Sequence, residues 1–235
     1  MPNAYFRFKQ FTVHQDRCAL KVGTDGVLLG AWTRYAGVRG ILDIGTGTGV
    51  VALIAAQRCP EAVVHAVELD RASALQAREN AQASPWHGRI TVHQADIRTW
   101  PPASGIDLVL CNPPFYKGHS VSKNDRMATA KHEGPLSMEA LFAAVEHCLA
   151  QVGRLSMVWP LDRWNDVLAV AAAHGFFPAR GCAVCYRAGK APKRMLVEFA
   201  RNGNHAAWEQ LTVQDADGRF TPEYRTLLGD LELHF

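Results

Sequence analysis

The stretch DLVLCNPPFYKG, residues 107–118, places an amide, two prolines and an aromatic ring directly after a short apolar run. The Asn112 side-chain oxygen and the Pro113 carbonyl are two acceptors that can orient an amino group whose lone pair is delocalised into a ring or carbonyl. Pro114 stiffens this turn, because proline fixes backbone angles, and Phe115 offers a face on which a planar group can stack. These four residues are the predicted catalytic group, acting by positioning and electrostatics.

A glycine-rich turn, LDIGTGTGVVAL, puts Gly45, Gly47 and Gly49 between an apolar run and a helix-forming segment. Glycines let the backbone turn tightly and let a ligand approach closely, and the amides of a helix N-terminus suit a carboxylate or phosphate. The GxGxG spacing, with Asp43 before it, differs from the G-x-G-x-x-G of dinucleotide-binding turns. This difference disfavours a NAD-dependent oxidoreductase.

Acidic residues end three successive predicted strands: Asp43, Glu68 and Asp96. The carboxyl ends of parallel strands meet at the ligand crevice of an open sheet. There Glu68 can accept hydrogen bonds from two ribose hydroxyls, and Asp96 can accept one from the amine of an adenine with Ile97 against the ring.

This arrangement resembles class I methyltransferases that use S-adenosylmethionine, and the resemblance places Asp43 near the methionine end of the cofactor. The expected cofactor-binding residues are Lys21, Asp43, Gly45, Thr46, Gly47, Gly49, Glu68, Leu69, Asp96, Ile97 and Asn112.

The elements that must position these residues read as strands alternating with helices. Predicted strands cover 40–44, 62–70, 89–96, 106–112 and 153–160, followed by a final pair at 176–186 and 194–201. Predicted helices cover 50–58, 70–83, 137–150 and 161–174, with Asp70 and Ser137 as N-caps and Gly175 as the last stop. The pattern predicts an α/β, Rossmann-like class I methyltransferase fold: a mostly parallel seven-stranded sheet with helices on both faces and an antiparallel final strand pair.

We expect one methyltransferase domain over residues 1–235. Residues 1–39 form an N-terminal segment expected to close over the cofactor and substrate, 40–201 the catalytic core, and 202–235 a C-terminal extension. In the first segment, FKQFTV (8–13) reads as strand-like and KVGTDGVLLGAW (21–32) as a turn followed by a short helix, with Lys21 or Asp25 able to line the site.

A closer resemblance rests on three stretches. Residues 6–32 look like the opening of the tRNA1(Val) (adenine(37)-N6)-methyltransferase family, and DRMATAKHEGPLS resembles its R-x-A-R-x-E region, with Lys131 where arginine is expected. The NPPF turn matches amino-methyltransferases whose targets include adenine N6, guanine N2 and the glutamine side-chain amide. The resemblance implies methyl transfer from S-adenosylmethionine to the N6 amino group of adenine 37, beside the anticodon of a valine tRNA.

Two basic segments agree with an RNA partner, because an anticodon loop presents dense phosphates and unstacked bases. One follows the catalytic turn directly, and the other connects the final strand pair. The predicted RNA-binding residues are Lys117, Lys123, Arg126, Lys131, Arg187, Lys190, Lys193 and Arg194. A simple solvated face is the alternative interpretation of both segments.

Composition narrows the class further. The chain has 235 residues, of which 48% are hydrophobic and 20% charged, with a net charge of +3. With no signal-peptide core and no apolar run of membrane-spanning length, we expect a cytoplasmic protein without a membrane partner.

The cysteines do not indicate a metal site. The close pair Cys182 and Cys185 could supply only two of the four ligands that a structural zinc site needs, so we expect no metal. Cys111 reads as a small buried strand residue and not as the nucleophile of a cytosine-carbon methyltransferase.

Two other functions remain open from the residues alone. The same turn can serve guanine N2 in ribosomal RNA or a protein glutamine, although the glutamine-modifying class favours tyrosine at position 115 and a separate helical substrate domain. A nucleotide- or RNA-binding module without catalysis predicts a degraded turn, whereas Asn112 to Phe115 are all present.

Overall fold

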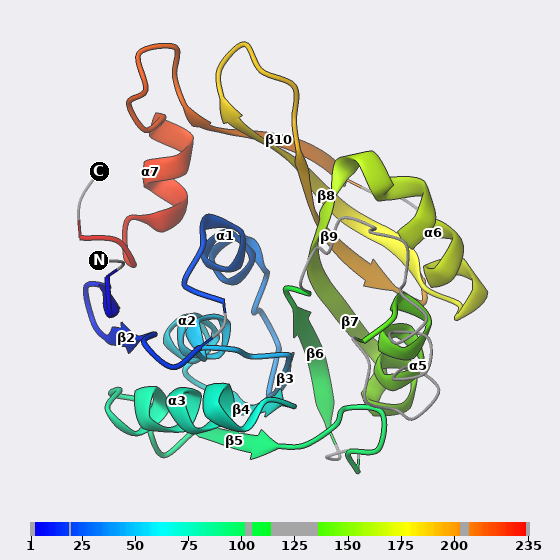
Figure 1. The fold of residues 1–235 in the computed structure, drawn as a ribbon. Coiled ribbons are helices and arrows are strands. Elements are labelled where there is room, and N and C mark those ends of the chain that lie inside the picture. Colours follow the sequence, from blue (N-terminus) through cyan, green and yellow to red (C-terminus); the bar gives the residue numbers. More distant parts are fainter. Residues whose placement is uncertain (1–2, 19, 102–104, 114–135, 203–206, 234–235) are drawn as a thin grey trace, which may run out of the picture.

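The computed structural model describes residues 3–18, 20–101, 105–113, 136–202 and 207–233. Within these ranges its main feature is an eight-stranded sheet in the order β10-β8-β9-β7-β6-β3-β4-β5 (Figure 1). The strands are β3 (Gly40–Ile44), β4 (Val63–Glu68), β5 (Ile90–Gln94), β6 (Ile106–Cys111), β7 (Leu149–Pro160), β8 (Phe177–Arg187), β9 (Arg194–Ala200) and β10 (Ala207–Gln214). The helices are α1 (Thr24–Trp32), α2 (Val50–Arg58), α3 (Arg71–Gln82), α5 (Met138–Cys148), α6 (Trp164–Ala173) and α7 (Pro222–Leu228), and a 3₁₀ turn, η1 (Leu161–Arg163), precedes α6.

The pairing pattern confirms the expected mostly parallel sheet. β5, β4, β3, β6 and β7 are parallel neighbours, and β9 runs antiparallel to both β7 and β8. The sheet has one strand more than predicted, because β10, from the expected C-terminal extension, pairs parallel with β8. Leu211 and Val213 of β10 are buried. The strand thereby covers an edge of β8 that would otherwise expose unpaired backbone groups.

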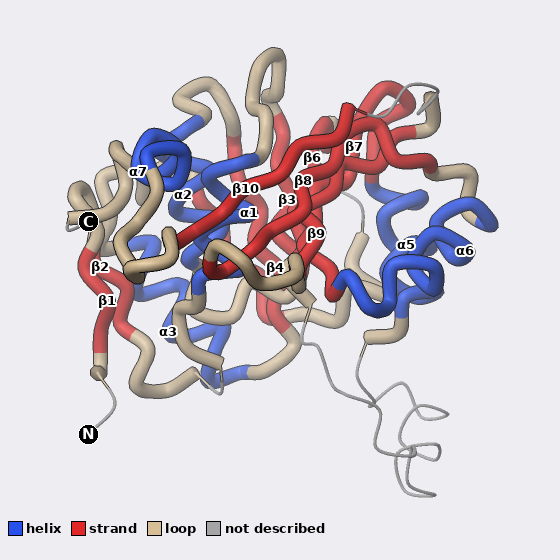
Figure 2. The backbone as a smooth tube through the Cα atoms, turned by 90° about the horizontal axis from the view of Figure 1, so that it is seen from above, coloured by secondary structure: helices blue, strands red, loops and turns tan. Residues whose placement is uncertain are grey.

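Helices cover both faces of the sheet, as predicted. α1, α2, α3 and α7 contribute to one hydrophobic core, whereas α5 and α6 contribute to the other. Figure 2 shows the strands between these two groups of helices. α2 carries the all-apolar run VVALIAA because it is buried between the sheet and α1. The two helices approach closely at Gly30, where a Cβ would lie 2.8 Å from Ile54 Cγ2.

The two chain ends pack together. The segment 8–13, expected as one strand-like run, instead contains the turn of a hairpin between β1 (Tyr5–Arg7) and β2 (Thr12–His14). Phe8 and Phe11 are both buried and their rings stack 4.5 Å apart, which turns the chain between them. The Lys9 amide then donates to the Leu231 carbonyl at 2.8 Å. The C-terminal extension therefore supports the N-terminal hairpin.

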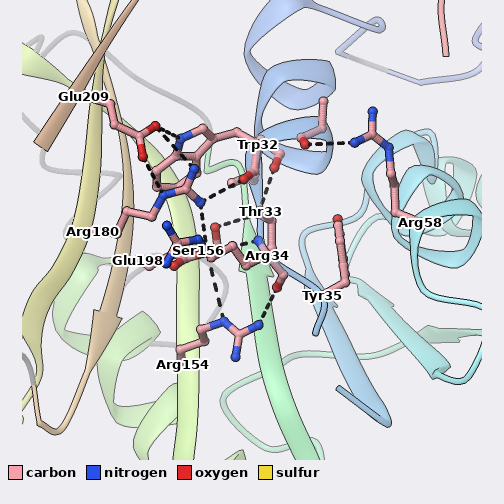
Figure 3. Close-up of polar contacts among 12 residues, drawn as sticks. Trp32, Thr33, Arg34, Tyr35, Arg58, Arg154, Ser156, Arg180, Glu198 and Glu209 are labelled. Carbon is pink, nitrogen blue, oxygen red and sulfur yellow. Dashed lines mark hydrogen bonds and ion pairs between the residues drawn. The ribbon is translucent and has the colours of Figure 1, made fainter. Parts of the chain in front are cut away.

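The C-terminal end of α1 is anchored to the sheet by a network of polar contacts (Figure 3). The Arg180 guanidinium lies over the Trp32 ring, 4.0 Å from its centroid, and donates to the Trp32 carbonyl at 3.0 Å. Glu209 accepts from Arg180 at 3.1 Å, and these hydrogen bonds hold the pKa of Glu209 below its usual value. The hydroxyls of Thr33 and Ser156 are 2.7 Å apart. The C-terminal end of α1 thus has a fixed position on β7, β8 and β10.

Candidate active site

A cavity of about 550 Å³ opens at the carboxyl ends of β3, β4, β5 and β6. It lies where a parallel sheet reverses its winding, the usual ligand position in such folds. Its lining residues are Ile44, Gly45, Val67, Glu68, Leu69, Asp70, Arg71, Gln94, Ala95, Asp96, Ile97, Arg98, Cys111, Asn112, Pro113 and Leu136. The structure therefore brings together residues of the glycine-rich turn, the strand-end acids Glu68 and Asp96, and the predicted catalytic turn.

The glycine-rich turn follows β3 with a left-handed backbone. Gly45, Gly47 and Gly49 have φ values of 68°, 56° and 83°, which disfavour any side chain. The amides of Gly45 and Thr46 donate to the Val67 carbonyl at 2.9 and 3.2 Å, which fixes the turn against β4. A Cβ on Gly45 or Gly47 would meet no atom within 4 Å. The space beside the turn is therefore open to a ligand.

Glu68 ends β4 and is held by two backbone amides. Its carboxylate oxygens accept from Gly47 N–H and from Asp70 N–H, both at 2.9 Å. Each carboxylate oxygen has a further lone pair available to a hydroxyl donor. The two amides therefore hold this carboxylate in one orientation, in which its two oxygens can also accept from a pair of ribose hydroxyls. Asp70 also caps α3 as predicted, accepting from Ser73 N–H at 2.8 Å.

Asp96 lies on the wall of the cavity in a close pair with Arg98. Both Asp96 oxygens accept from Arg98 Nε at 2.8 Å, and one also accepts from the Arg98 amide at 3.0 Å. Ile97 is buried and Leu69 is exposed, and both line the same cavity. An adenine between these two side chains would share the Asp96 carboxylate with Arg98. Sequence reasoning did not include Arg98, although its spacing of two residues from Asp96 allowed the pair.

Asp43 has a different place from the other two acids. It is only 1% exposed, does not line the cavity, and accepts from the Thr46 hydroxyl at 2.5 Å. Burial raises its pKa to about 7, although the Thr46 hydroxyl and an amide at Ala52 act in the opposite direction. Asp43 therefore contacts the glycine-rich turn from within the protein, and Thr46 is likewise buried.

The predicted catalytic turn, residues 112–115, begins where β6 ends. Asn112 and Pro113 both line the cavity. The missing Cβ of Gly26 in α1 would lie 3.2 Å from Asn112 Nδ2, so the amide packs directly against that helix. Sequence reasoning did not identify this contact, because Gly26 has no side chain to indicate it. Pro114 and Phe115 lie outside the described residues.

Cys111 precedes this turn and is 1% exposed. Burial raises the pKa of its thiol, which disfavours the thiolate a covalent mechanism requires. Cys182 packs in the core, and the Cys185 thiol donates to the Arg187 and Lys190 carbonyls. All six cysteines are free thiols.

The strands β7 and β8 run in the same direction, because each is antiparallel to β9, and β6 is parallel to β7. The basic connection that follows β8 therefore lies at the carboxyl ends of the parallel strands, as does the predicted catalytic turn that follows β6. Lys190 and Lys193 are exposed, and Arg187 is exposed while donating to the Ala216 carbonyl at 2.7 Å. Arg194 is half-buried and pairs with Asp25 at 2.8 Å. The other predicted RNA-binding residues, Lys117, Lys123, Arg126 and Lys131, lie outside the described residues.

Lys21 is exposed, and its amine donates to the Asn3 carbonyl at 3.3 Å without lining the cavity. Within the described ranges no cluster of three or more His, Cys, Asp or Glu side chains is arranged to hold a metal ion. The same part of the chain holds no helix with the length and hydropathy of a membrane span.

The chemistry of the cavity matches S-adenosylmethionine. An open glycine-rich turn suits the close approach of a small ligand, the oriented Glu68 suits a ribose, and Leu69 with Ile97 offers apolar surface for an adenine. Fold and cavity together define a class I methyltransferase that uses S-adenosylmethionine.

Comparison with known proteins agrees with the assignment as a methyltransferase. Residues 24–163 match the family model of the methyltransferase small domain. A protein of Tolumonas auensis named tRNA1(Val) (adenine(37)-N6)-methyltransferase is 41% identical, over 97% of this chain and 96% of its own. One of the same name from Bacteroides thetaiotaomicron is 40% identical, over 100% of this chain and 99% of its own. The chain belongs to the tRNA1(Val) (adenine(37)-N6)-methyltransferase family.

Solved structures show the same fold at low identity. A predicted O-methyltransferase from Agrobacterium tumefaciens superimposes with a TM-score of 0.68 at 20% identity, covering 88% of this chain and 96% of its own. A putative RNA methyltransferase from Pyrococcus horikoshii gives a TM-score of 0.52 at 17% identity, covering 73% and 80%. These two likenesses support the fold only.

Proposed function

We propose that this enzyme methylates the N6 amino group of an adenine in tRNA, and that its target is adenine 37 beside the anticodon of a valine tRNA. The observation that carries the chemistry is the place of Asn112 and Pro113 on the wall of the cavity that also holds Glu68, Asp96 and Gly45. The names of the family members support the choice of tRNA and of the position.

The residues of the chain act on the amino group in the following way. The Asn112 side-chain oxygen and the Pro113 carbonyl accept its two N–H bonds and so hold the nitrogen toward the cofactor. S-adenosylmethionine supplies the electrophilic methyl group. As positive charge grows on the nitrogen, the two hydrogen bonds become charge-assisted and stronger, which favours the transition state over the bound substrate. The N–C bond forms as the bond between the methyl carbon and the cofactor sulfur breaks, and the nitrogen then releases one of its two N–H protons to solvent. The two acceptors orient the amino group and stay unprotonated.

The cofactor-binding residues are proposed in two groups. Gly45, Glu68, Leu69, Asp96, Ile97 and Asn112 line the cavity and would contact the cofactor directly. Asp43, Thr46, Gly47 and Gly49 act through the conformation of the turn. We also propose Lys21, in the N-terminal segment 1–39, as a cofactor-binding residue, although it does not line the cavity. Pro114 and Phe115 complete the proposed catalytic turn.

For the RNA, we propose that the connection between β8 and β9 contacts the phosphate backbone. The main candidates are Lys190 and Lys193, whose residues are exposed to solvent on the side of the sheet where the proposed catalytic turn lies. Arg187 and Arg194 also have protein partners, so their contribution to RNA affinity is shared with a role in the fold. The segment that contains Lys117, Lys123, Arg126 and Lys131 is proposed as the second contact. A tRNA substrate implies a cytoplasmic place of work.

The test is nucleoside mass spectrometry of total tRNA incubated with the purified protein and S-adenosylmethionine. We expect N6-methyladenosine to appear, and to map to position 37 of a valine tRNA after oligonucleotide digestion. Appearance of N2-methylguanosine without N6-methyladenosine would overturn the adenine assignment. The Asn112→Ala variant is the control, since it should lose turnover while it still binds the cofactor.

A further inference from the structure

Consecutive residues of α1 contact two distant parts of the molecule. Asp25 lies in the first turn, and its side chain is 20% exposed. One carboxylate oxygen accepts from the Tyr186 hydroxyl, and the other accepts from Arg194 Nε at 2.8 Å. Tyr186 is near the end of β8 and Arg194 begins β9, on either side of the basic connection. The Asp25 carboxylate therefore ties α1 to that connection.

The next residue touches the catalytic turn. A Cβ on Gly26 would lie 3.2 Å from Asn112 Nδ2 and 3.5 Å from Val51 Cγ2, so the Asn112 amide fills the space that the glycine leaves. The contact is one of backbone against side chain. A shift of the first turn of α1 by a few tenths of an ångström therefore moves the surface against which the Asn112 amide rests.

The first turn of α1 has no ordinary capping bond. Gly23 is the N-cap, and no side chain accepts a hydrogen bond from the turn at that position. The other end of the helix is anchored by Arg180, Glu209 and Ser156 (Figure 3). Without such a cap, the bonds that the Asp25 carboxylate accepts from Tyr186 and Arg194 are what tie the end of the helix that touches Asn112 to the sheet.

We propose that Asp25 is a positioning residue for methyl transfer. Held by Tyr186 and Arg194, it fixes the first turn of α1 so that Gly26 supports Asn112 in the orientation that accepts the amino group. This inference rests on the proposed function of Asn112, and it assigns Arg194 a part in the reaction that is separate from RNA affinity. A misplaced acceptor weakens catalysis steeply, because the productive geometry is narrow.

The experiment compares full-length Asp25→Ala, Asp25→Asn and Tyr186→Phe with the wild type. The rate of a single turnover is measured at saturating tRNA and S-adenosylmethionine, and cofactor affinity is measured by titration calorimetry. We expect Asp25→Ala to lower the single-turnover rate by about 10-fold or more, with cofactor affinity within about 2-fold of the wild type. The single-turnover rates of Asp25→Asn and Tyr186→Phe should lie between those of Asp25→Ala and the wild type, because each variant retains one of the two hydrogen bonds at position 25.

Two further variants sharpen the result. Asp25→Ala combined with Tyr186→Phe should be no slower than Asp25→Ala alone, because Tyr186 acts through Asp25. Asp166→Asn is the matched control: Asp166 also lies in the first turn of a helix beside an arginine, in α6, and its rate should equal that of the wild type.

A wild-type rate in Asp25→Ala overturns the proposal, as does a loss of rate matched by an equal loss of cofactor affinity. Tyr186→Phe removes only a hydroxyl, so it supplies the test if Asp25→Ala fails to fold: a wild-type rate in that variant overturns the proposal equally. A wild type that leaves tRNA adenine unmodified contradicts the proposed function instead, which keeps the two failures distinct.

Discussion

Asp43 makes the stability of this protein depend on pH in an unusual direction. Burial raises its pKa to about 7 from the 3.8 of an exposed aspartate. Between these two values the folded state binds a proton that the unfolded state releases, so the free energy of unfolding falls as pH rises. The slope is about 1.4 kcal/mol per pH unit. The loss approaches about 4 kcal/mol by neutral pH and does not increase further above the folded-state pKa.

Asp43→Asn removes this titration while keeping the size of the side chain. The difference in unfolding free energy, variant minus wild type, should therefore increase by about 3 kcal/mol between about pH 5 and about pH 8. Equilibrium urea unfolding followed by tryptophan fluorescence measures it at each pH. Other titrating groups are common to both proteins and cancel in the difference.

The control is Asp166→Asn, whose side chain in the wild type is 71% exposed. Its difference from the wild type should stay nearly constant over the same pH range. A constant difference for Asp43→Asn as well would refute the reasoning. It would mean that Asp43 is ionised in the folded protein throughout, and that its hydrogen bonds from Thr46 and Ala52 outweigh its burial.

Three further predictions concern the site. Glu68→Ala should weaken S-adenosylmethionine binding by about 10-fold or more, because it removes a carboxylate that also accepts from two backbone amides. Titration calorimetry measures this affinity, and a comparison with Glu68→Gln separates the effect of the negative charge from that of the side-chain shape. Asn112→Ala should abolish turnover in a methylation assay with cofactor affinity unchanged, and retained activity would show that another group orients the amine. Lys190→Ala with Lys193→Ala should weaken tRNA binding and reduce its salt slope by about 2. Unchanged affinity and slope would remove the connection between β8 and β9 from the RNA interface.

Local patterns in the chain were sufficient to predict much of the core. The alternation of apolar runs with helix-forming segments predicted seven strands and their helices, because periodicity and caps are short-range properties. Gly45 and Gly47 indicated a tight turn open to a ligand, and Glu68 indicated a carboxylate at the end of the next strand. Parallel strands meet at one edge, so these residues were expected at one cavity, and they line or border it.

Other features could not be read from the sequence, because they join residues that the fold brings together from far apart. Asp25 and Arg194 are separated by 169 positions, and their ion pair exists only because α1 packs where β8 ends and β9 begins. Asp43 reads like the other strand-end acids, yet the path of the turn buries it.

The sequence by itself determined the class of chemistry, through the Asn-Pro-Pro-Phe turn and the glycine-rich turn that resemble those of methyltransferases. The tertiary structure decided which acids face the cavity and what holds Asn112 in place. The physical reason is that backbone conformation follows mainly from neighbouring residues, whereas burial and ion pairing depend on what the rest of the chain packs against each group.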